Sequence, residues 1–110
     1  MSAIEDELAW QLQCAQISFE REFKFHPTRQ WRADFKIGSN ILVEVEGLVY
    51  RQIGSEQSRH TTITGYTHDC EKYNEAQLLG YKILRFTQEH IANGSALKTI
   101  ERAISTSINI

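Results

Sequence analysis

The chain lacks long hydrophobic runs. Nowhere in its 110 residues does an apolar stretch approach the ~20 residues that a membrane-spanning helix requires. A basic N-terminal segment is missing too, because residues 1–7 carry three acids where a secretory signal would be positively charged. We therefore expect a soluble, cytoplasmic protein that is not associated with a membrane.

Cysteine and net positive charge are also scarce. Cys14 and Cys70 lie far apart without Cys-x-x-Cys spacing, which argues against a zinc site and against a disulfide framework, so we expect two buried or half-buried free thiols. The 14 acids outnumber the 12 lysines and arginines and give a formal net charge of −2. This balance argues against nucleic-acid binding through bulk positive potential alone.

The positive charge is nevertheless unevenly distributed. Five of the 12 basic residues fall within 16 consecutive positions, namely Arg21, Lys24, Arg29, Arg32 and Lys36. Such a run is typical either of a local basic patch or of ordinary solvated strands. Arg32 and Lys36 are candidate nucleic-acid contacts within it.

What the sequence does contain is a concentration of acids on one predicted β-hairpin. Two alternating runs, 31–37 and 41–46, flank Gly38-Ser39-Asn40, and a three-residue loop containing glycine is a recognised hairpin connection. If Ile37 faces Ile41, Asp34 lies opposite Glu44. The same register places Arg32 opposite Glu46.

Period-two alternation predicts that these acids share one face of the hairpin. The apolar face would hold Trp31, Ala33, Phe35, Ile37, Ile41, Val43 and Val45. Opposed like charges destabilise a sheet, and carboxylate oxygens suit Mg²⁺, so a divalent cation shared by Asp34 and Glu44 would explain the arrangement. The alternative is a solvated face on which Arg32 pairs with Glu46.

Hydrophobic periodicity predicts the other elements of a single domain over residues 1–110. A capping box at Ser2 and Glu5 begins the first helix. The predicted ranges are a helix over 2–17, a strand over 19–25, a polar loop over 47–65, a helix over 66–79, a strand over 81–86, a short helix to 94 and a last helix from 95 that frays beyond 105. Tyr66, Cys70, Tyr73 and Gln77 mark one face of the helix over 66–79, and Tyr66, Tyr73 and Tyr81 are expected to be core residues with a polar edge. This order implies a mixed sheet with helices packed on it.

An aspartate on the second strand and Glu-x-Glu on the third resemble the core of the PD-(D/E)XK nuclease superfamily. The segments that carry the resemblance are Trp31-Arg-Ala-Asp34, Val43-Glu-Val-Glu46-Gly47, Arg59-His60, Asp69-Cys-Glu-Lys-Tyr-Asn74 and Gly80-Tyr-Lys-Ile-Leu-Arg-Phe86. They look like the small, often phage-borne endonucleases related to the very-short-patch-repair endonuclease, with Holliday junction resolvases as more distant relatives. The resemblance implies an α/β (α+β) fold with a restriction-endonuclease-like αβββαβ core, a mixed sheet flanked by helices.

The resemblance also implies roles for individual residues. Asp34 matches the strand aspartate, Glu44 the second metal-binding acid and Glu7 the helical glutamate of the family. Glu46 stands where the family's lysine usually stands, so either Lys72 from the following helix replaces that lysine or Glu46 is itself a ligand or base.

Two further positions of the resemblance fall in the segment after the hairpin. His60 is a candidate for acid/base chemistry or phosphate contact, and Arg59 is a candidate nucleic-acid contact that could stabilise developing charge.

The expected function is that of a Mg²⁺- or Mn²⁺-dependent endodeoxyribonuclease in a bacterial or phage-infected cell. Phosphodiester hydrolysis needs a metal to polarise the phosphoryl oxygen and activate water, and a cation for the developing charge. The alternative is a catalytically inactive nuclease-fold module for DNA binding or assembly. A domain this small covers little DNA, so cutting both strands would require a homodimer or two encounters.

Overall fold

The structure is a computed structural model that describes the backbone of residues 2–47 and 56–108 and the side chains of residues 2–47 and 64–106. The elements are α1 (Ala3–Cys14), β1 (Phe19–Lys24), β2 (Arg32–Ile37), β3 (Ile41–Val45), α2 (Glu56–Leu78), β4 (Lys82–Phe86), α3 (Gln88–Ala92) and α4 (Ser95–Ile108). Ser2 caps α1 by accepting a hydrogen bond from the Glu5 backbone N–H at 3.1 Å, as the capping signal predicts.

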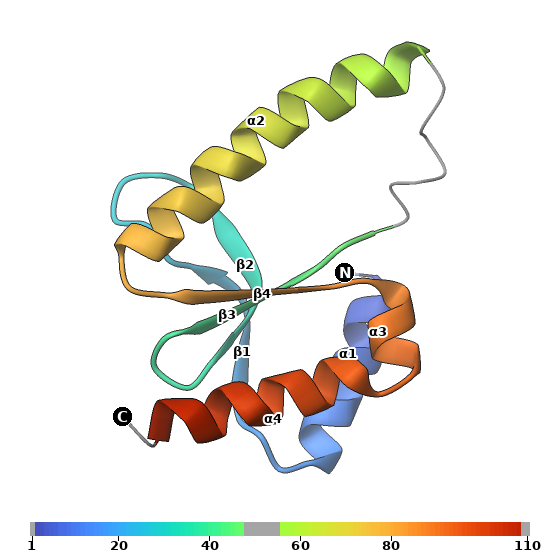
Figure 1. The fold of residues 1–110 in the computed structure, drawn as a ribbon, viewed down its shortest axis with the longest axis vertical. Helices are drawn as coiled ribbons and strands as arrows, with labels where there is room; N and C mark the ends of the chain where they lie inside the picture. Colours follow the sequence, from blue (N-terminus) through green and yellow to red (C-terminus); the bar gives the residue numbers. More distant parts are fainter. Residues whose placement is uncertain (1, 48–55, 109–110) are drawn as a thin grey trace.

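The four strands form one mixed sheet in the order β1-β2-β3-β4. The first three strands are an antiparallel meander, and β4 pairs parallel with β3 because α2 crosses between them. Ile37 pairs with Ile41, which confirms the predicted hairpin register. Figure 1 shows α2 on one side of this sheet and α1, α3 and α4 on the other.

The sheet divides the hydrophobic core into two clusters. The cluster on the side of α1, α3 and α4 includes Leu8, Leu12, Phe35, Ile37, Ile41, Val43, Phe86, Ile91 and Ile100. The cluster on the side of α2 includes Phe25, Ala33, Leu42 and Ala76, with Phe23, Trp31, Tyr81 and Ile83 packed against it. Since both faces of the sheet are covered, β3 is buried from Ile41 to Glu44 instead of alternating.

The predicted alternation is therefore wrong for part of β2. Phe35 packs in the cluster beside α1, whereas Ala33 packs in the cluster under α2, so the strand changes face at Asp34. The neighbouring residue of β1, Glu22, adopts a left-handed conformation with φ of 51°. A left-handed residue breaks the pleat, and the sequence carries no glycine there that would have indicated it.

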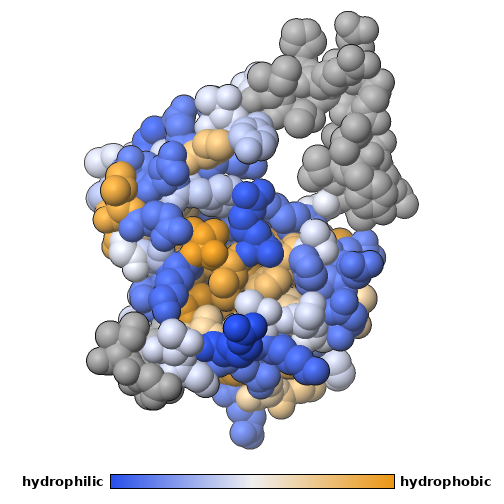
Figure 2. Space-filling view, in the orientation of Figure 1, coloured by the Kyte–Doolittle hydropathy of each residue, from blue (hydrophilic) through white to orange (hydrophobic). Residues whose placement is uncertain are grey.

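The predicted polar loop over 47–65 is wrong for residues 56–65, because α2 begins at Glu56; residues 48–55 lie outside the described part of the chain. The predicted face is wrong for Tyr66, Cys70 and Gln77, which are exposed, whereas Tyr73 is half-buried. Tyr66 is 70% exposed, while Ala76 is fully buried. The sequence of α2 has little helical hydrophobic periodicity, so its start and its buried face could not be located from the pattern. Figure 2 shows a largely hydrophilic outer surface over the described part of α2, with hydrophobic atoms at its C-terminal end, where Leu78 is exposed.

The expectations for the cysteines and for a membrane-spanning helix can also be compared with the structure. Both cysteines are free, but Cys14 and Cys70 are exposed rather than buried. Among the helices of the described residues, none combines the length and apolar character needed to cross a membrane.

We predict that Leu42→Ala lowers the free energy of unfolding by about 2–5 kcal/mol, because Leu42 is fully buried under α2 and its truncation leaves a cavity. Leu78→Ala is the matched control, because Leu78 is 80% exposed and its truncation should change stability by about 0.5 kcal/mol or less. Urea unfolding followed by circular dichroism measures both. Equal losses for the two variants would contradict the assignment of the second core cluster.

Candidate active site

Charged side chains lie at one level across all four strands. Glu22 and Asp34 lie between the paired positions Arg21–Phe35 and Phe23–Ala33 of β1 and β2. Glu44 is the corresponding residue of β3 and pairs with Arg85 of β4. We call Glu22, Asp34 and Glu44, together with Glu5 of α1, the acidic row.

Backbone N–H groups of β2 and β3 bind the carboxylates of Asp34 and Glu44. The Asp34 N–H donates to Glu44 Oε2 at 3.1 Å, and the Val45 N–H donates to Asp34 Oδ2 at 2.7 Å. These side-chain bonds occur where the regular backbone register between β2 and β3, which runs from Ile37 to Phe35, has ended. Both carboxylates are thus held in fixed positions by strand β3 and its partner.

Lys72 of α2 reaches down to the other oxygen of Glu44. Its Nζ donates to Glu44 Oε1, and the two residues form an ion pair. The Glu44 side chain is only 7% exposed. Burial raises the pKa of Glu44 from 4.5 to about 7, although the bond and charge of Lys72 act against the rise. Both Glu44 oxygens therefore have donors from within the chain.

Three carboxylates meet on the other side of Asp34. Oxygens of Glu5, Glu22 and Asp34 all lie within 4.8 Å of one another. Burial, together with the negative charges of Asp34 and Glu22, raises the pKa of the Glu5 carboxyl. Carboxylates this close repel unless a cation lies between them, so among the described residues these three are candidates to hold a divalent metal.

Local structure explains how Glu5 and Glu22 reach Asp34. The Ser2 cap places Glu5 in the first turn of α1, and the Ser2 hydroxyl donates to Glu5 Oε2 at 3.4 Å. Glu22 is held in a left-handed conformation that costs a non-glycine residue roughly 1–2 kcal/mol. Strain of this kind is commonly found at functional sites.

The structure brings together only part of the predicted site. Asp34, Glu44 and Lys72 are neighbours, whereas Glu7 accepts a hydrogen bond from Gln11 at 3.0 Å and lines a pocket between α1 and α3. On α1 it is Glu5, two residues earlier, that lies beside Asp34.

The other predicted residues are not among the carboxylates that meet at Asp34. Glu46 is paired with Arg85 rather than with Arg32, and Lys36 is paired with Glu20 at 3.7 Å. Arg32 is exposed. Arg59 and His60 belong to the first turns of α2, and their side chains lie outside the described part of the chain.

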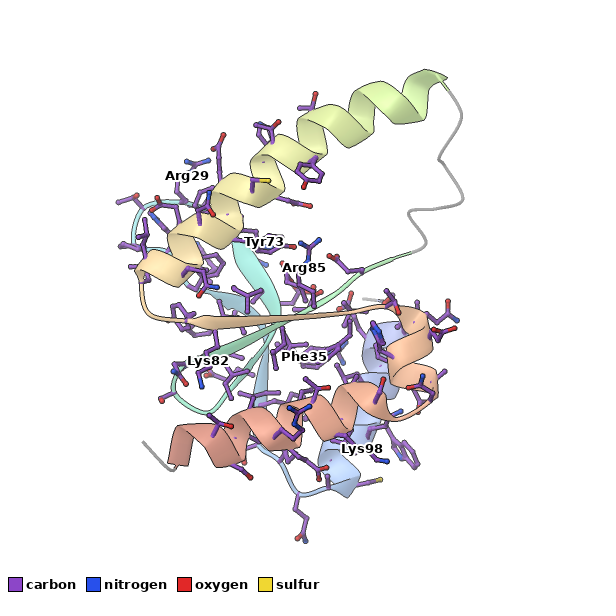
Figure 3. The ribbon with its side chains drawn as sticks, in the orientation of Figure 1. Arg29, Phe35, Tyr73, Lys82, Arg85 and Lys98 are labelled. Carbon is purple, nitrogen blue, oxygen red and sulfur yellow. The ribbon has the colours of Figure 1, made fainter. Side chains whose placement is uncertain are left out.

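Sequence reasoning missed Glu5, Glu22, Tyr73 and Arg85 as members of the site. Tyr73 and Arg85 face each other between α2 and the sheet (Figure 3), with the Arg85 guanidinium 4.5 Å from the centre of the Tyr73 ring. Burial, aided by the negative charges of Glu44 and Glu46, raises the pKa of the Tyr73 hydroxyl, which therefore stays protonated. Glu22 lies opposite Asp34 through the register between β1 and β2, which the loop over 25–31 does not indicate in the sequence, and Tyr73 and Arg85 depend on the crossover geometry.

Comparison with known proteins supports the fold. No protein-family model and no curated protein matches this sequence. Among solved structures, the catalytic domain of the homing endonuclease I-Bth0305I is similar to this chain with a TM-score of 0.65 and 16% sequence identity, over 97% of each chain. At this identity the likeness establishes the fold, and it confirms the predicted class of a mixed sheet flanked by helices.

We predict that Glu22→Gly stabilises the protein by about 1 kcal/mol and weakens its stabilisation by Mn²⁺. Glycine adopts a positive φ without strain, and the change also removes a repelling carboxylate. Gln16→Gly is the matched control, since Gln16 has φ of 60° and is not part of the acidic row. Thermal unfolding with EDTA or Mn²⁺ measures both effects. Full Mn²⁺ stabilisation of Glu22→Gly would exclude Glu22 as a ligand.

We predict that Glu44 makes stability fall as pH rises from about 4.5 to 7 in metal-free buffer. The folded state keeps the Glu44 proton up to about 7, whereas the unfolded chain releases it near 4.5, so the stabilisation present at low pH is lost across this window. Urea unfolding at a series of pH values should show a flatter profile for Glu44→Gln. Lys72→Met should move the wild-type decline to higher pH, because Lys72 lowers the pKa of Glu44; a shift to lower pH would contradict the assignment.

Proposed function

We propose that this protein is a metal-dependent endonuclease that hydrolyses DNA phosphodiester bonds. The observation that carries the proposal is the convergence of Glu5, Glu22 and Asp34 from three elements beside the Glu44–Lys72 pair. A fold similar to a homing endonuclease catalytic domain supports it. We assign the chain to the PD-(D/E)XK superfamily, in the branch of the very-short-patch-repair endonuclease, because the order of its motif residues favours that placement.

Asp34, Glu5 and Glu22 would hold the divalent ion, Mg²⁺ or Mn²⁺. Their oxygens are hard ligands, and an open carboxylate site leaves positions for water and a phosphate oxygen. When bound, such an ion polarises the phosphoryl oxygen and lowers the pKa of its water. The sequence-based prediction named Asp34 and Glu44 as the metal ligands. In the proposed set Glu5 and Glu22 take the place of Glu44, because Glu44 already accepts hydrogen bonds at both oxygens, from Lys72 and from the Asp34 backbone.

Lys72 takes the role of the lysine that the PD-(D/E)XK superfamily usually carries at the position of Glu46. It is held over the sheet by Glu44, with its side chain 18% exposed, so its charge is fixed close to the acidic row. A preorganised cation in a partly buried site stabilises negative charge that develops on a phosphoryl group. Glu44 is therefore a positioning residue for Lys72 in this mechanism.

Glu46 has a different role in the proposal. Its carboxylate is bound by Arg85, whose guanidinium lies over the Tyr73 ring. This arrangement favours a structural link between β3, β4 and α2 over a role as metal ligand or base. Arg59 and His60 at the start of α2 are kept as candidate contacts to DNA, and a cytoplasmic location and a homodimer remain predictions.

We predict that Asp34→Asn reduces nicking of supercoiled plasmid to the level seen in EDTA. Asparagine retains an oxygen that can accept from the Val45 N–H, but it removes the negative charge that the metal needs. Glu101→Gln on α4 is the control, because it is an exposed amide replacement away from the acidic row. The assay compares plasmid and a branched oligonucleotide in Mg²⁺, Mn²⁺ and EDTA.

Circular dichroism of each variant separates loss of activity from loss of fold. Residual metal-dependent nicking by folded Asp34→Asn would exclude Asp34 as an essential ligand. A wild-type protein that binds DNA but cuts neither substrate in either metal would favour the alternative function, a catalytically inactive module for DNA binding or assembly.

A further inference from the structure

The basic residues of the first two strands divide into two groups. Arg21 faces α1, where its Nη2 lies 3.1 Å from Asp6 and 3.8 Å from Glu5. Lys36 pairs with Glu20 at 3.7 Å and lies over the Phe23 ring. The charges of these two residues are therefore offset within the fold, and Lys36 is no longer a strong candidate for nucleic-acid contact.

The other three basic residues, Lys24, Arg29 and Arg32, lie at the last residue of β1, in the connecting loop and at the first residue of β2. We call them the basic hairpin end. All three are exposed, and among the side chains that the structure describes none of them forms an ion pair with an acid. Their positive charge is thus available to an external anion.

Lys24 and Arg32 are directly paired across β1 and β2. Side chains at such positions lie ~5 Å apart at Cβ, and like charges there destabilise the sheet. An anion placed between the two side chains would remove this repulsion. Two cations repel each other here, as the carboxylates of the acidic row do at Asp34.

Arg29 is held in place by stacking rather than by an acid. Its guanidinium lies 4.0 Å from the centre of the Trp31 ring, and Trp31 is stacked on Phe25 with an interplanar angle of 15°. Phe25 is buried in the core cluster under α2. Arg29 therefore has a rigid support, which lowers the entropy that it loses on binding an anion. In Figure 3 it lies beside the C-terminal half of α2.

The basic hairpin end directly adjoins the acidic row. Lys24 and Arg32 are each two residues from an acid of that row, Glu22 and Asp34, which corresponds to about 7 Å along a strand. Phe23 and Ala33 point toward α2, so Lys24 and Arg32 point to the opposite face, where Glu5 of α1 approaches Asp34. Cations and metal-binding acids thus follow each other along the same two strands.

We propose that the basic hairpin end binds the phosphate backbone of the nucleic-acid substrate next to the bond that is cut. A polyanion matches a set of cations without acidic partners better than a single small anion does. This inference rests on the proposed nuclease function and extends it by assigning the substrate-backbone contacts nearest the acidic row to Lys24 and Arg32, with Arg29 as a further contact on the α2 side of the same hairpin end. Arg32 was a candidate from the sequence; Lys24 and Arg29 were not.

Binding of a fluorescent DNA duplex in EDTA tests this surface without cleavage. Anisotropy titrations at a series of salt concentrations give the slope of log K against log salt. We expect the double variant Lys24→Gln/Arg32→Gln to bind more weakly. The magnitude of its slope should be smaller by roughly 1.8, since each phosphate contact contributes about 0.9. Removing two like charges should not destabilise the fold, and circular dichroism checks this; the single variant Arg32→Gln, with an expected loss of about 0.9, serves if the pair misfolds.

Lys98→Gln/Arg102→Gln is the matched control, because it makes the same change in net charge on exposed residues of α4. Figure 3 places Lys98 across the sheet from Arg29. The control should leave the slope unchanged. An equal loss in both double variants, an unchanged slope in the hairpin variant, or no binding of DNA by the wild type would overturn the inference.

Two further results separate this inference from the proposed function and from another partner. Plasmid nicking by the wild type is scored independently, so absence of nicking with a slope change confined to the hairpin variant would refute the nuclease and retain the binding surface. Polyglutamate is the second probe. If it bound as tightly as DNA and with the same dependence on Lys24 and Arg32, the surface would belong to an acidic polypeptide instead and the nucleic-acid assignment would be wrong.

Discussion

Repulsion between carboxylates at Asp34 is the constraint on which the rest of the structure depends. Glu5, Glu22 and Asp34 are within 4.8 Å of one another, and Glu44 binds the Asp34 backbone from the other side. Water cannot fully screen charges in partly buried positions, so the chain must supply compensation or a cation must be bound. Lys72 compensates Glu44, whereas on the other side Arg21, 3.8 Å from Glu5 and 3.1 Å from Asp6, faces three carboxylates of the acidic row.

Several irregular features of the fold meet at this point. β2 changes face at Asp34, Glu22 takes a left-handed conformation, and backbone N–H groups of Asp34 and Val45 bond to carboxylates instead of completing a regular ladder. The two core clusters on either side keep the strands in place despite the interruption. A protein that needed only stability would have little reason to retain such a site, and this is why we connect it with metal binding and catalysis.

Sequence patterns were sufficient for the parts of the fold that follow regular periodicity. The Ser2 cap, the hairpin register at Ile37 and Ile41, and the mixed sheet were all predicted, because each depends on local turn or cap chemistry or on topology rules. The start of α2 was not, because the sequence of this helix has little helical hydrophobic periodicity. Within the site, the choice of Glu5 over Glu7 depends on a rotation of α1 that spacing alone does not determine.

The most direct test of the metal centre is the anomalous difference density of a crystal soaked in Mn²⁺. We predict one peak at about 2.1 Å from a carboxylate oxygen of Asp34, with Glu5 or Glu22 as a second ligand and the Glu44–Lys72 pair intact. A peak between Asp34 and Glu44 with Lys72 displaced, or no peak at Asp34 at saturating Mn²⁺, would contradict this assignment.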